Sequence, residues 1–304
     1  MVIESVGYAF KMVKEKPFFP VIIGLISLII GGLGVVFSAI FSGLFFIPAI
    51  KNIDAIRVIF SNFFTKVSAL KAVKTGMIAG NSEASYVQSG YESIIELSKS
   101  LISMMYSFPE VFILIIFGVL IFIFLLSFII SFIYIGWIKV SLDFCDKGKS
   151  SVRSFYNKFS VVFKVIASFA LKSILLLLPL LLAGFICKMM QFNTFSLLLL
   201  FLMFILESYL SLKFYFFKFF IVDQGSGIIS SLKNSFFLRG VTLPLFLLFI
   251  LYYFISFTSS FILSIISNRA IYLVLYFISN VYIAFIWFIA VSYLYKKSIR
   301  SIEN

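Results

Sequence analysis

Long apolar stretches, almost free of charge, alternate along this chain with connections that carry its polar residues. The clearest stretches lie between Lys16 and Lys51, between Glu110 and Lys139, between Arg239 and Arg269, and between Arg269 and Lys296. About 20 apolar residues at 1.5 Å rise per residue cross the roughly 30 Å hydrocarbon core of a bilayer. The pattern therefore predicts an all-α fold, a polytopic membrane helical bundle.

Six transmembrane helices are expected from this pattern. They fall at about residues 18–47, 111–138, 165–187, 192–212, 241–266 and 271–295. The segment 51–110 contains too many apolar residues, and too little Gly and Pro, for a disordered linker, so it is predicted to form an outer helical loop. We interpret residues 1–304 as a single integral membrane domain without an additional soluble domain.

Composition agrees with a protein that folds in lipid. Hydrophobic residues make up 62% of the chain and charged residues 12%, against about 25% charged residues in ordinary soluble domains. The net charge of +13 would favour nucleic acid as a partner in a soluble protein. Basic residues of membrane proteins instead collect in cytoplasmic loops, so we expect no nucleic-acid partner here.

Connections rich and poor in Lys and Arg alternate along the chain. The amino-terminal segment, the loops after the second and fourth spans and the carboxy-terminal tail are rich, whereas the other two short turns hold only Lys188 and only Arg269. This alternation predicts a multi-pass protein of the cell membrane with both termini in the cytoplasm. The loop 51–110 also carries basic residues, but loops of that length cross largely regardless of their charge.

A short amphipathic segment precedes each of three predicted hairpins. Apolar positions recur at i, i+3 and i+7, with a serine two residues after the first: Ile3, Val6, Phe10 with Ser5; Val152, Phe155, Phe159 with Ser154; and Ile229, Leu232, Phe236 with Ser231. Such a stripe beside Lys and Arg is typical of a helix in the membrane plane. The sequence predicts interfacial helices before spans 1, 3 and 5, with anionic lipid headgroups at the cytoplasmic face as partners. Any amphipathic helix shows this spacing, so common ancestry of the three units stays open.

Two ionisable residues interrupt the predicted third and fourth spans. Lys172 and Glu207 lie at nearly equal distances from the turn between these spans, which places both near the cytoplasmic end of an antiparallel hairpin. An ionisable group in hydrocarbon is costly and is often functional. We expect an ion pair between them, or a Lys172 side chain that snorkels while Glu207 bonds to Lys213 or to a hydroxyl. A proton or ion relay is the less favoured interpretation, because a relay needs several such groups along a path.

Small and polar residues mark other candidate contacts within the spans. Gly34, Ser38 and Ser42 recur every four residues, so one face of the first span is smooth enough for a second helix to pack closely. Asn280 in the last span is expected to hydrogen-bond between helices. Together with Ser260 and Ser264 it could instead line a polar substrate path.

Motifs for chemistry are absent from the sequence. The chain has no His, and its two cysteines, Cys145 and Cys187, fall on opposite sides of the predicted membrane. This argues against a zinc or haem site. There is also no Walker lysine loop, no dinucleotide fingerprint and no G-x-S-x-G elbow. We therefore expect neither a cofactor nor enzymatic activity.

One stretch carries a resemblance to known families. It runs Ile221-Val222-Asp223-Gln224-Gly225, then Ser231-Leu232-Lys233-Asn234-Ser235, then Leu238-Arg239-Gly240. This stretch, with the Lys-Pro opening before the first span, resembles prokaryotic six-span integral membrane families. They include the membrane domain attached to some glycerophosphoryl diester phosphodiesterases. Phe236 stands where these families often have Trp, and no phosphodiesterase domain follows, so the resemblance implies architecture and not that activity.

Two classes of function remain open at the level of sequence. The first is a non-enzymatic multi-pass protein that acts as a scaffold, an accessory subunit or a lipid-organising component, as a tightly packed apolar bundle would favour. The second is a secondary transporter or permease-like subunit for a small or lipidic solute, as a midplane cavity lined by Asn280 and neighbouring hydroxyls would favour. Protein partners and oligomeric state are not fixed by the sequence.

Overall fold

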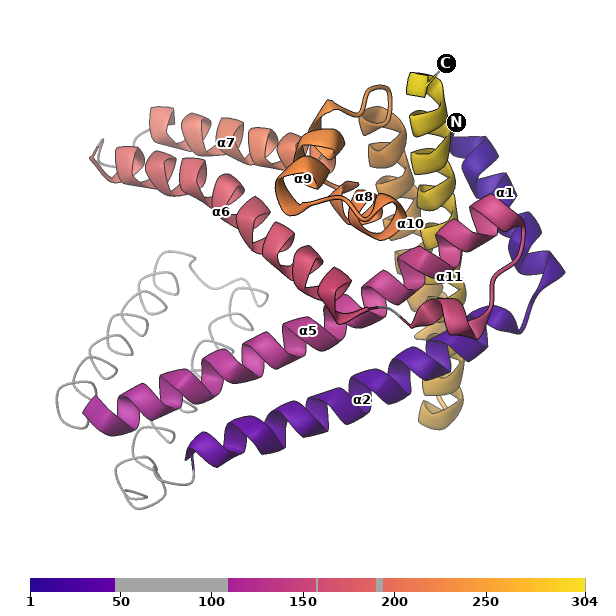
Figure 1. The fold of residues 1–304 in the computed structure, drawn as a ribbon, viewed down its shortest axis with the longest axis horizontal. Helices are drawn as coiled ribbons and strands as arrows, with labels where there is room; N and C mark the ends of the chain where they lie inside the picture. The colour runs from indigo at the N-terminus through magenta and orange to yellow at the C-terminus, as the bar shows by residue number, and fades with distance from the viewer. Residues whose placement is uncertain (47–108, 157, 190–193, 304) are drawn as a thin grey trace. The chain divides into compact units, whose positions relative to one another are not determined.

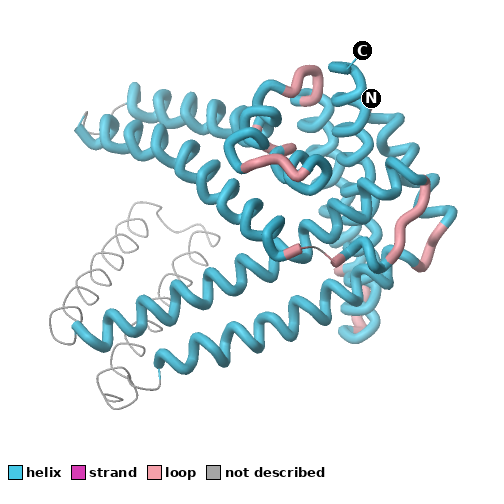
Figure 2. The backbone as a smooth tube through the Cα atoms, viewed as in Figure 1, coloured by secondary structure: helices cyan, strands magenta, loops and turns pink. Residues whose placement is uncertain are grey.

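The computed structural model describes residues 1–46, 109–156, 158–189 and 194–303, and these residues form helices and connecting loops with no strand (Figures 1 and 2). This confirms the all-α prediction. A helix satisfies its backbone hydrogen bonds internally, which a segment surrounded by lipid requires. Of the predicted outer helical loop 51–110, residues 51–108 lie outside the described residues, and Pro109 begins the next described helix.

Most ends of the predicted spans agree with helix ends to within about three residues, but one helix begins at Phe159 instead of 165 and two others end at Lys147 and Glu303 instead of 138 and 295. The elements are α1 Val2–Glu15, α2 Phe19–Phe46, α5 Pro109–Lys147, the 3-10 turn η2 Val152–Phe155, α6 Phe159–Met189, α7 Thr194–Lys213, α8 Phe217–Gln224, α9 Ile228–Phe237, α10 Thr242–Leu263 and α11 Arg269–Glu303. Among the described helices, α2, α5, α6, α10 and α11 are long and apolar enough to cross a membrane. The 20-residue α7 covers the predicted fourth span, with Glu207 and Lys213 in its second half.

The chain divides into two compact units. One contains residues 1–32 and 127–304, and the other contains residues 33–126. Within the first unit, α6 lies against α7, α10 lies against α11, and α1 runs beside α11, which brings the two chain termini close together (Figure 1). The candidate sites described below lie in this unit, apart from the small residues of α2.

Aromatic side chains fill the core of the first unit. Tyr295 of α11 is fully buried, and its ring centroid lies 5.7 Å from that of Phe216 and 5.3 Å from that of Phe219. Trp137 of α5 stacks on Phe288 at 5.5 Å. Each buried aromatic ring removes a large apolar area from its surroundings, and such pairs add about 0.5–1.5 kcal/mol beyond the area term.

Helix α8 was not expected from the hydropathy pattern. Its residues Phe217, Phe219, Phe220 and Ile221 are buried, so it packs inside the unit instead of forming a loop. Gly225 ends the helix in a left-handed conformation with φ 66°, which glycine adopts without strain. Gly227 then precedes α9 directly, so these glycines form the turn between α8 and α9.

The second of the three predicted interfacial helices is not a helix of that kind. Val152–Phe155 forms only a 3-10 turn, and Phe155 is fully buried. The reason lies in α5: Gly136 has no side chain, and the Phe155 ring occupies the space where a Cβ would stand. The middle residue of the predicted stripe is therefore anchored in the protein core, whereas Phe159 is exposed and begins α6. The first and third segments do form helices, α1 and α9.

Candidate functional site

Four segments that the charge pattern assigned to one membrane side meet at one end of the first unit. Lys296 of α11 contacts Asp146 at the end of α5 at 2.9 Å and Asp223 at the end of α8 at 2.8 Å. Lys297 contacts Glu4 of α1 at 2.6 Å. These ion pairs join the amino-terminal helix, the two basic loops and the carboxy-terminal tail.

Helix α1 is fixed to this end by further polar contacts. Tyr8 donates a hydrogen bond to the Phe144 carbonyl at 2.8 Å, and its ring stacks on Tyr293 at 4.9 Å. The hydrogen bond from Lys297, followed by the one from the amino-terminal amine, lowers the pKa of Glu4 below its ordinary value. The charged groups of α1 thus complement those of the chain terminus.

One face of α1 is buried against the protein, and another face is exposed. Ser5, Ala9 and Met12 are buried, whereas Ile3 is 88% exposed and Phe10 is also exposed. Ile3 of the predicted apolar stripe therefore points away from the protein, whereas Val6 packs against the core and the small-residue face packs on α11. The exposed part of the stripe suits the acyl boundary of a bilayer.

Helix α9 repeats the buried serine and the exposed first apolar residue of α1, whereas Leu232, the second apolar residue of its stripe, is buried. Ser231 is buried and donates to the Ile228 carbonyl at 2.8 Å, as Ser5 donates to the Val2 carbonyl at 2.8 Å. Ile229, the counterpart of Ile3, is 75% exposed. The serine of the sequence repeat thus faces the protein in both helices, because its hydroxyl is satisfied by the carbonyl three residues earlier and needs no water.

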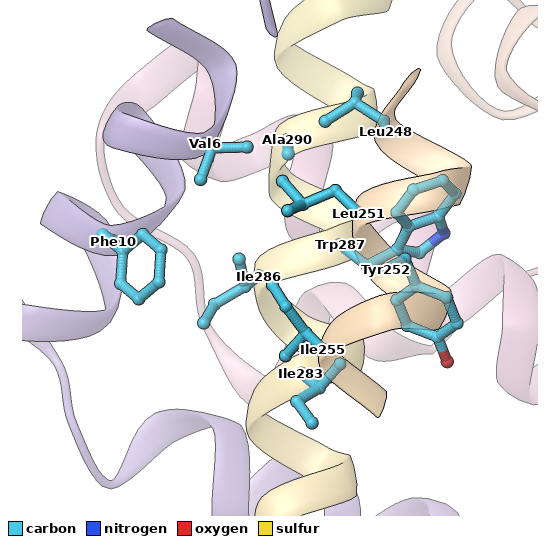
Figure 3. A pocket seen from close by; sticks show the side chains of 10 residues that line it. All are labelled: Val6, Phe10, Leu248, Leu251, Tyr252, Ile255, Ile283, Ile286, Trp287 and Ala290. Carbon is cyan, nitrogen blue, oxygen red and sulfur yellow. The ribbon is translucent and has the colours of Figure 1, made fainter. Parts of the chain in front are cut away.

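An apolar cavity of about 60 Å³ lies beside α1 (Figure 3). Val6 and Phe10 of α1 form one side, and side chains of α10 and α11 form the other. Among the labelled side chains, Tyr252 and Trp287 carry the polar atoms. This lining fits an apolar group and offers no set of groups for acid–base chemistry.

A larger cavity of about 350 Å³ lies between α5, α6 and α8. Its polar lining is Ser127, Ser131, Tyr134 and Lys218, and its apolar lining is Ile130, Val165, Ile166, Phe169 and Ala170. Of these lining residues, Ile130 and Phe169 have exposed side chains, so the cavity is open to the surroundings of the helices. The lining of the cavity therefore combines the cationic Lys218 with apolar side chains, some of which are exposed.

Aromatic rings hold the Lys218 ammonium in place. Its Nζ lies 3.9 Å from the ring centroid of Tyr134 and 5.3 Å from that of Tyr215, and the two tyrosine hydroxyls are 3.1 Å apart. Within the described residues, no carboxylate lies within 4.0 Å of this ammonium. Burial lowers the pKa of Lys218, since the charged form loses solvation that no acid replaces.

Lys172 of α6 and Glu207 of α7 do not form the ion pair that was the first of the two expected arrangements. Lys172 donates to Ser211 Oγ at 3.1 Å, one helical turn beyond Glu207, and no ion pair joins Lys172 to Glu207 in the described chain. The lysine reaches a hydroxyl of α7 instead of the carboxylate. Lys172 also lies close enough to Lys218 for the two ammonium groups to repel each other.

The polar candidates of the last two spans do not converge. Asn280 donates to the Tyr276 carbonyl of its own helix at 2.7 Å, and Ser264 donates to the Phe261 carbonyl at 2.6 Å. The bond that crosses between α10 and α11 joins Ser259 and Ser279 at 2.6 Å. Neither Asn280 nor Ser260 lines either of the two cavities described above.

The small residues of α2 lie in the second unit. Ser38 and Ser42 are buried, and Ser42 donates to the Ser38 carbonyl at 2.7 Å, while Gly34 is half-buried. Burial of both serines is compatible with a packing face.

Sequence reasoning missed Lys218. The residues around it, Tyr215 to Ile221, are aromatic or apolar on every side. A helix that is apolar all round is a buried helix, and a single lysine within such a segment is a signal for a buried cation. The ring nearest to that cation belongs to Tyr134 of α5, in a distant part of the chain.

The described helices define the class of this molecule as an all-helical, multi-pass membrane protein. Large apolar side chains on long helices, such as Leu33 at 67% and Phe257 at 73% exposed, suit a lipid environment and would be costly in water. No family model, curated protein or solved structure matches the chain.

Proposed function

We propose that this protein is a non-enzymatic integral component of the cell membrane that organises anionic lipids at the cytoplasmic leaflet. The observation that carries the proposal is the orientation of α1. Its small-residue face packs on α11, its Ile3 and Phe10 are exposed, and Lys11, Lys14 and Lys16 follow on the same helix or directly after it. An apolar face beside basic residues binds the headgroup boundary of an anionic leaflet.

The proposal includes a six-span topology with both termini in the cytoplasm. Apart from the five helices that are long and apolar enough to cross, α7 supplies a further apolar segment of 20 residues. The ion pairs of Lys296 with Asp146 and Asp223 support one shared side for the loops and the tail. The resemblance of residues 221–240 to six-span prokaryotic families supports the same count, and we treat the chain as one integral membrane domain.

Two helices, α1 and α9, would serve as the interfacial elements. Their exposed apolar residues and the basic residues Lys11, Lys14 and Lys233 support contact with headgroups, and each nearby lysine adds about 1 kcal/mol of surface attraction. A transporter remains the second candidate. The observation in its favour is the cavity of about 350 Å³ at Lys218, although a transport path would have to reach both sides of the membrane.

The lipid preference can be measured on the full chain in mixed vesicles. Spin-labelled phosphatidylglycerol and phosphatidylcholine report the lipids at the protein boundary. We expect a preference for phosphatidylglycerol that weakens with salt and falls in the triple variant Lys11→Gln, Lys14→Gln, Lys16→Gln. The matched Arg triple variant should keep it. Equal selectivity in the wild type and the Gln variant would overturn the proposal.

Sidedness is tested separately by cysteine labelling. In a background with Cys145→Ser and Cys187→Ser, we expect Ser150→Cys to react with an impermeant maleimide only after cells are permeabilised. Ser82→Cys, in the predicted outer loop, should react on intact cells. Reaction of position 150 on intact cells would place the basic loops outside and remove the proposed leaflet.

A further inference from the structure

The cavity between α5, α6 and α8 has an excess of positive charge. Lys218 lines it, and Lys172 of α6 lies near enough to repel Lys218. Within the described residues, neither lysine forms an ion pair with a carboxylate, since Lys172 bonds to a hydroxyl. Two desolvated ammonium groups without an acid are costly, and an anion entering the cavity would offset that cost.

The cation is also presented in a fixed position. The rings of Tyr134, Tyr215 and Phe217 lie within 5.9 Å of its Nζ, with Tyr134 closest. Rings stabilise a cation without neutralising its charge. Ser131 and Tyr134 stand on the same lining, so hydroxyl-bearing side chains accompany the ammonium, and the Tyr134 hydroxyl pairs with that of Tyr215. This arrangement fits a phosphate oxygen, because Lys binds phosphate as a point charge.

The remaining wall of the cavity identifies the source of the phosphate. Val165, Ile166 and Phe169 of α6 are apolar, and two lining side chains, Ile130 and Phe169, are exposed on helices that can span the membrane. A free phosphate ion would gain nothing from this wall. An acyl chain would bury apolar area against it, at about 25 cal/mol per Å² in ordinary area accounting.

We propose that this cavity binds one anionic phospholipid, with its phosphate at Lys218 and an acyl chain along the α6 wall. The inference rests on the proposed function, because it takes the lipid from the same leaflet. It differs from that function in kind: α1 and α9 contact a boundary layer of many lipids, whereas the cavity holds a single molecule with a defined stoichiometry.

The test is native mass spectrometry of the full chain in detergent, titrated with phosphatidylglycerol and, separately, with phosphatidylcholine. We expect one saturable phosphatidylglycerol adduct in the wild type. Lys218→Met keeps an apolar stem over Tyr134 but removes the charge, and it should weaken this adduct by about tenfold, since a charge-assisted contact is lost. Lys149→Met, which removes an exposed lysine of the connection between α5 and η2, is the matched control and should bind as the wild type does.

A second variant keeps the test decisive if Lys218→Met does not fold. Ala170→Trp fills the opening from an exposed position and leaves both lysines in place, and it should abolish the saturable adduct. Wild-type binding by this folded variant would overturn the site. Binding of inorganic phosphate, dependent on Lys218 and undiminished by Ala170→Trp, without a lipid adduct, would overturn the assignment to lipid. The two proposals are tested independently. If the α1 triple Gln variant loses its boundary preference for phosphatidylglycerol but keeps the saturable adduct, the cavity site does not depend on α1.

Discussion

Gly24 on α2 and Val281 on α11 lie in direct contact. A Cβ at position 24 would stand 2.5 Å from Val281 Cγ2 and 2.8 Å from its Cγ1. Small residues allow membrane helices to approach closely in this way. The contact joins α2 to α11, and the two helices approach this closely because position 24 has no side chain.

Substitution at this contact should destabilise the protein and be repaired by its partner. Gly24→Ala is expected to cost about 1–3 kcal/mol from overpacking. In Gly24→Ala with Val281→Ala, the removed methyl groups make room for the new one. Thermal unfolding in detergent measures both, and a double-mutant cycle should show strong coupling. Additive effects of the two substitutions would mean that the helices do not touch at this point.

Gly136 on α5 makes the second close approach. A Cβ there would lie 2.8 Å from two ring atoms of Phe155, and that ring is fully buried and has no room to withdraw. We expect Gly136→Ala to lower the midpoint of thermal unfolding, by about 1–3 kcal/mol of stability. Gly184→Ala on α6 meets nothing within 4 Å and is the control, with an unchanged or raised midpoint. Similar midpoints for the two variants would contradict the packing of η2 on α5.

Lys296 holds two carboxylates that would otherwise face each other. Lys296→Met leaves Asp146 and Asp223 without their shared cation, and we expect a loss of about 1–3 kcal/mol in stability. Lys297→Met breaks only the exposed pair with Glu4 and should have a smaller effect. Thermal midpoints at low and high salt compare the two variants. A larger loss of stability in Lys297→Met would show that the contact of Lys296 with Asp146 and Asp223 contributes less than the Lys297–Glu4 pair.

The hydroxyl pair between α10 and α11 should couple, and Asn280 should not. Ser259→Ala and Ser279→Ala remove a bond between two helices, which averages about 0.6 kcal/mol in membrane proteins. Asn280 bonds to its own helix, so Asn280→Ala combined with Ser259→Ala should be additive. Coupling energies from unfolding in mixed detergent distinguish the two cases. Coupling at Asn280 would restore the interhelical role expected from its sequence position.

Anionic lipid binding at Lys218 should depend on pH. Only the protonated amine attracts the phosphate, and burial lowers the pKa of this lysine. Affinity should therefore be constant at low pH and fall as the pH rises through that lowered value, toward the ordinary lysine pKa of about 10.4. Lys172, Tyr134 and Tyr215 also face this lysine. Lipid titrations of Lys218→Gln should show little of this slope, whereas Lys172→Gln should retain it.

Hydropathy and charge along the chain were sufficient for the membrane class and for most helix boundaries. The predicted first span, 18–47, corresponds to α2 Phe19–Phe46, and the fifth, 241–266, to α10 Thr242–Leu263. A bilayer imposes a minimum length and an apolar composition on each crossing segment, and both properties are local. The serines of the amphipathic repeat were likewise visible before their burial in α1 and α9 was known.

Contacts between segments were decided only by the tertiary structure. Whether Phe155 lies on a surface or inside the protein depends on Gly136, and which group meets Lys172 depends on a one-turn offset that places Ser211 within reach instead of Glu207. The position of Lys218 between Tyr134 and Tyr215 brings together residues of different elements. The sequence by itself determined that the chain belongs in lipid, because that property sums over local composition. The cationic cavity depends on how helices distant in sequence pack, and no local pattern encodes that packing.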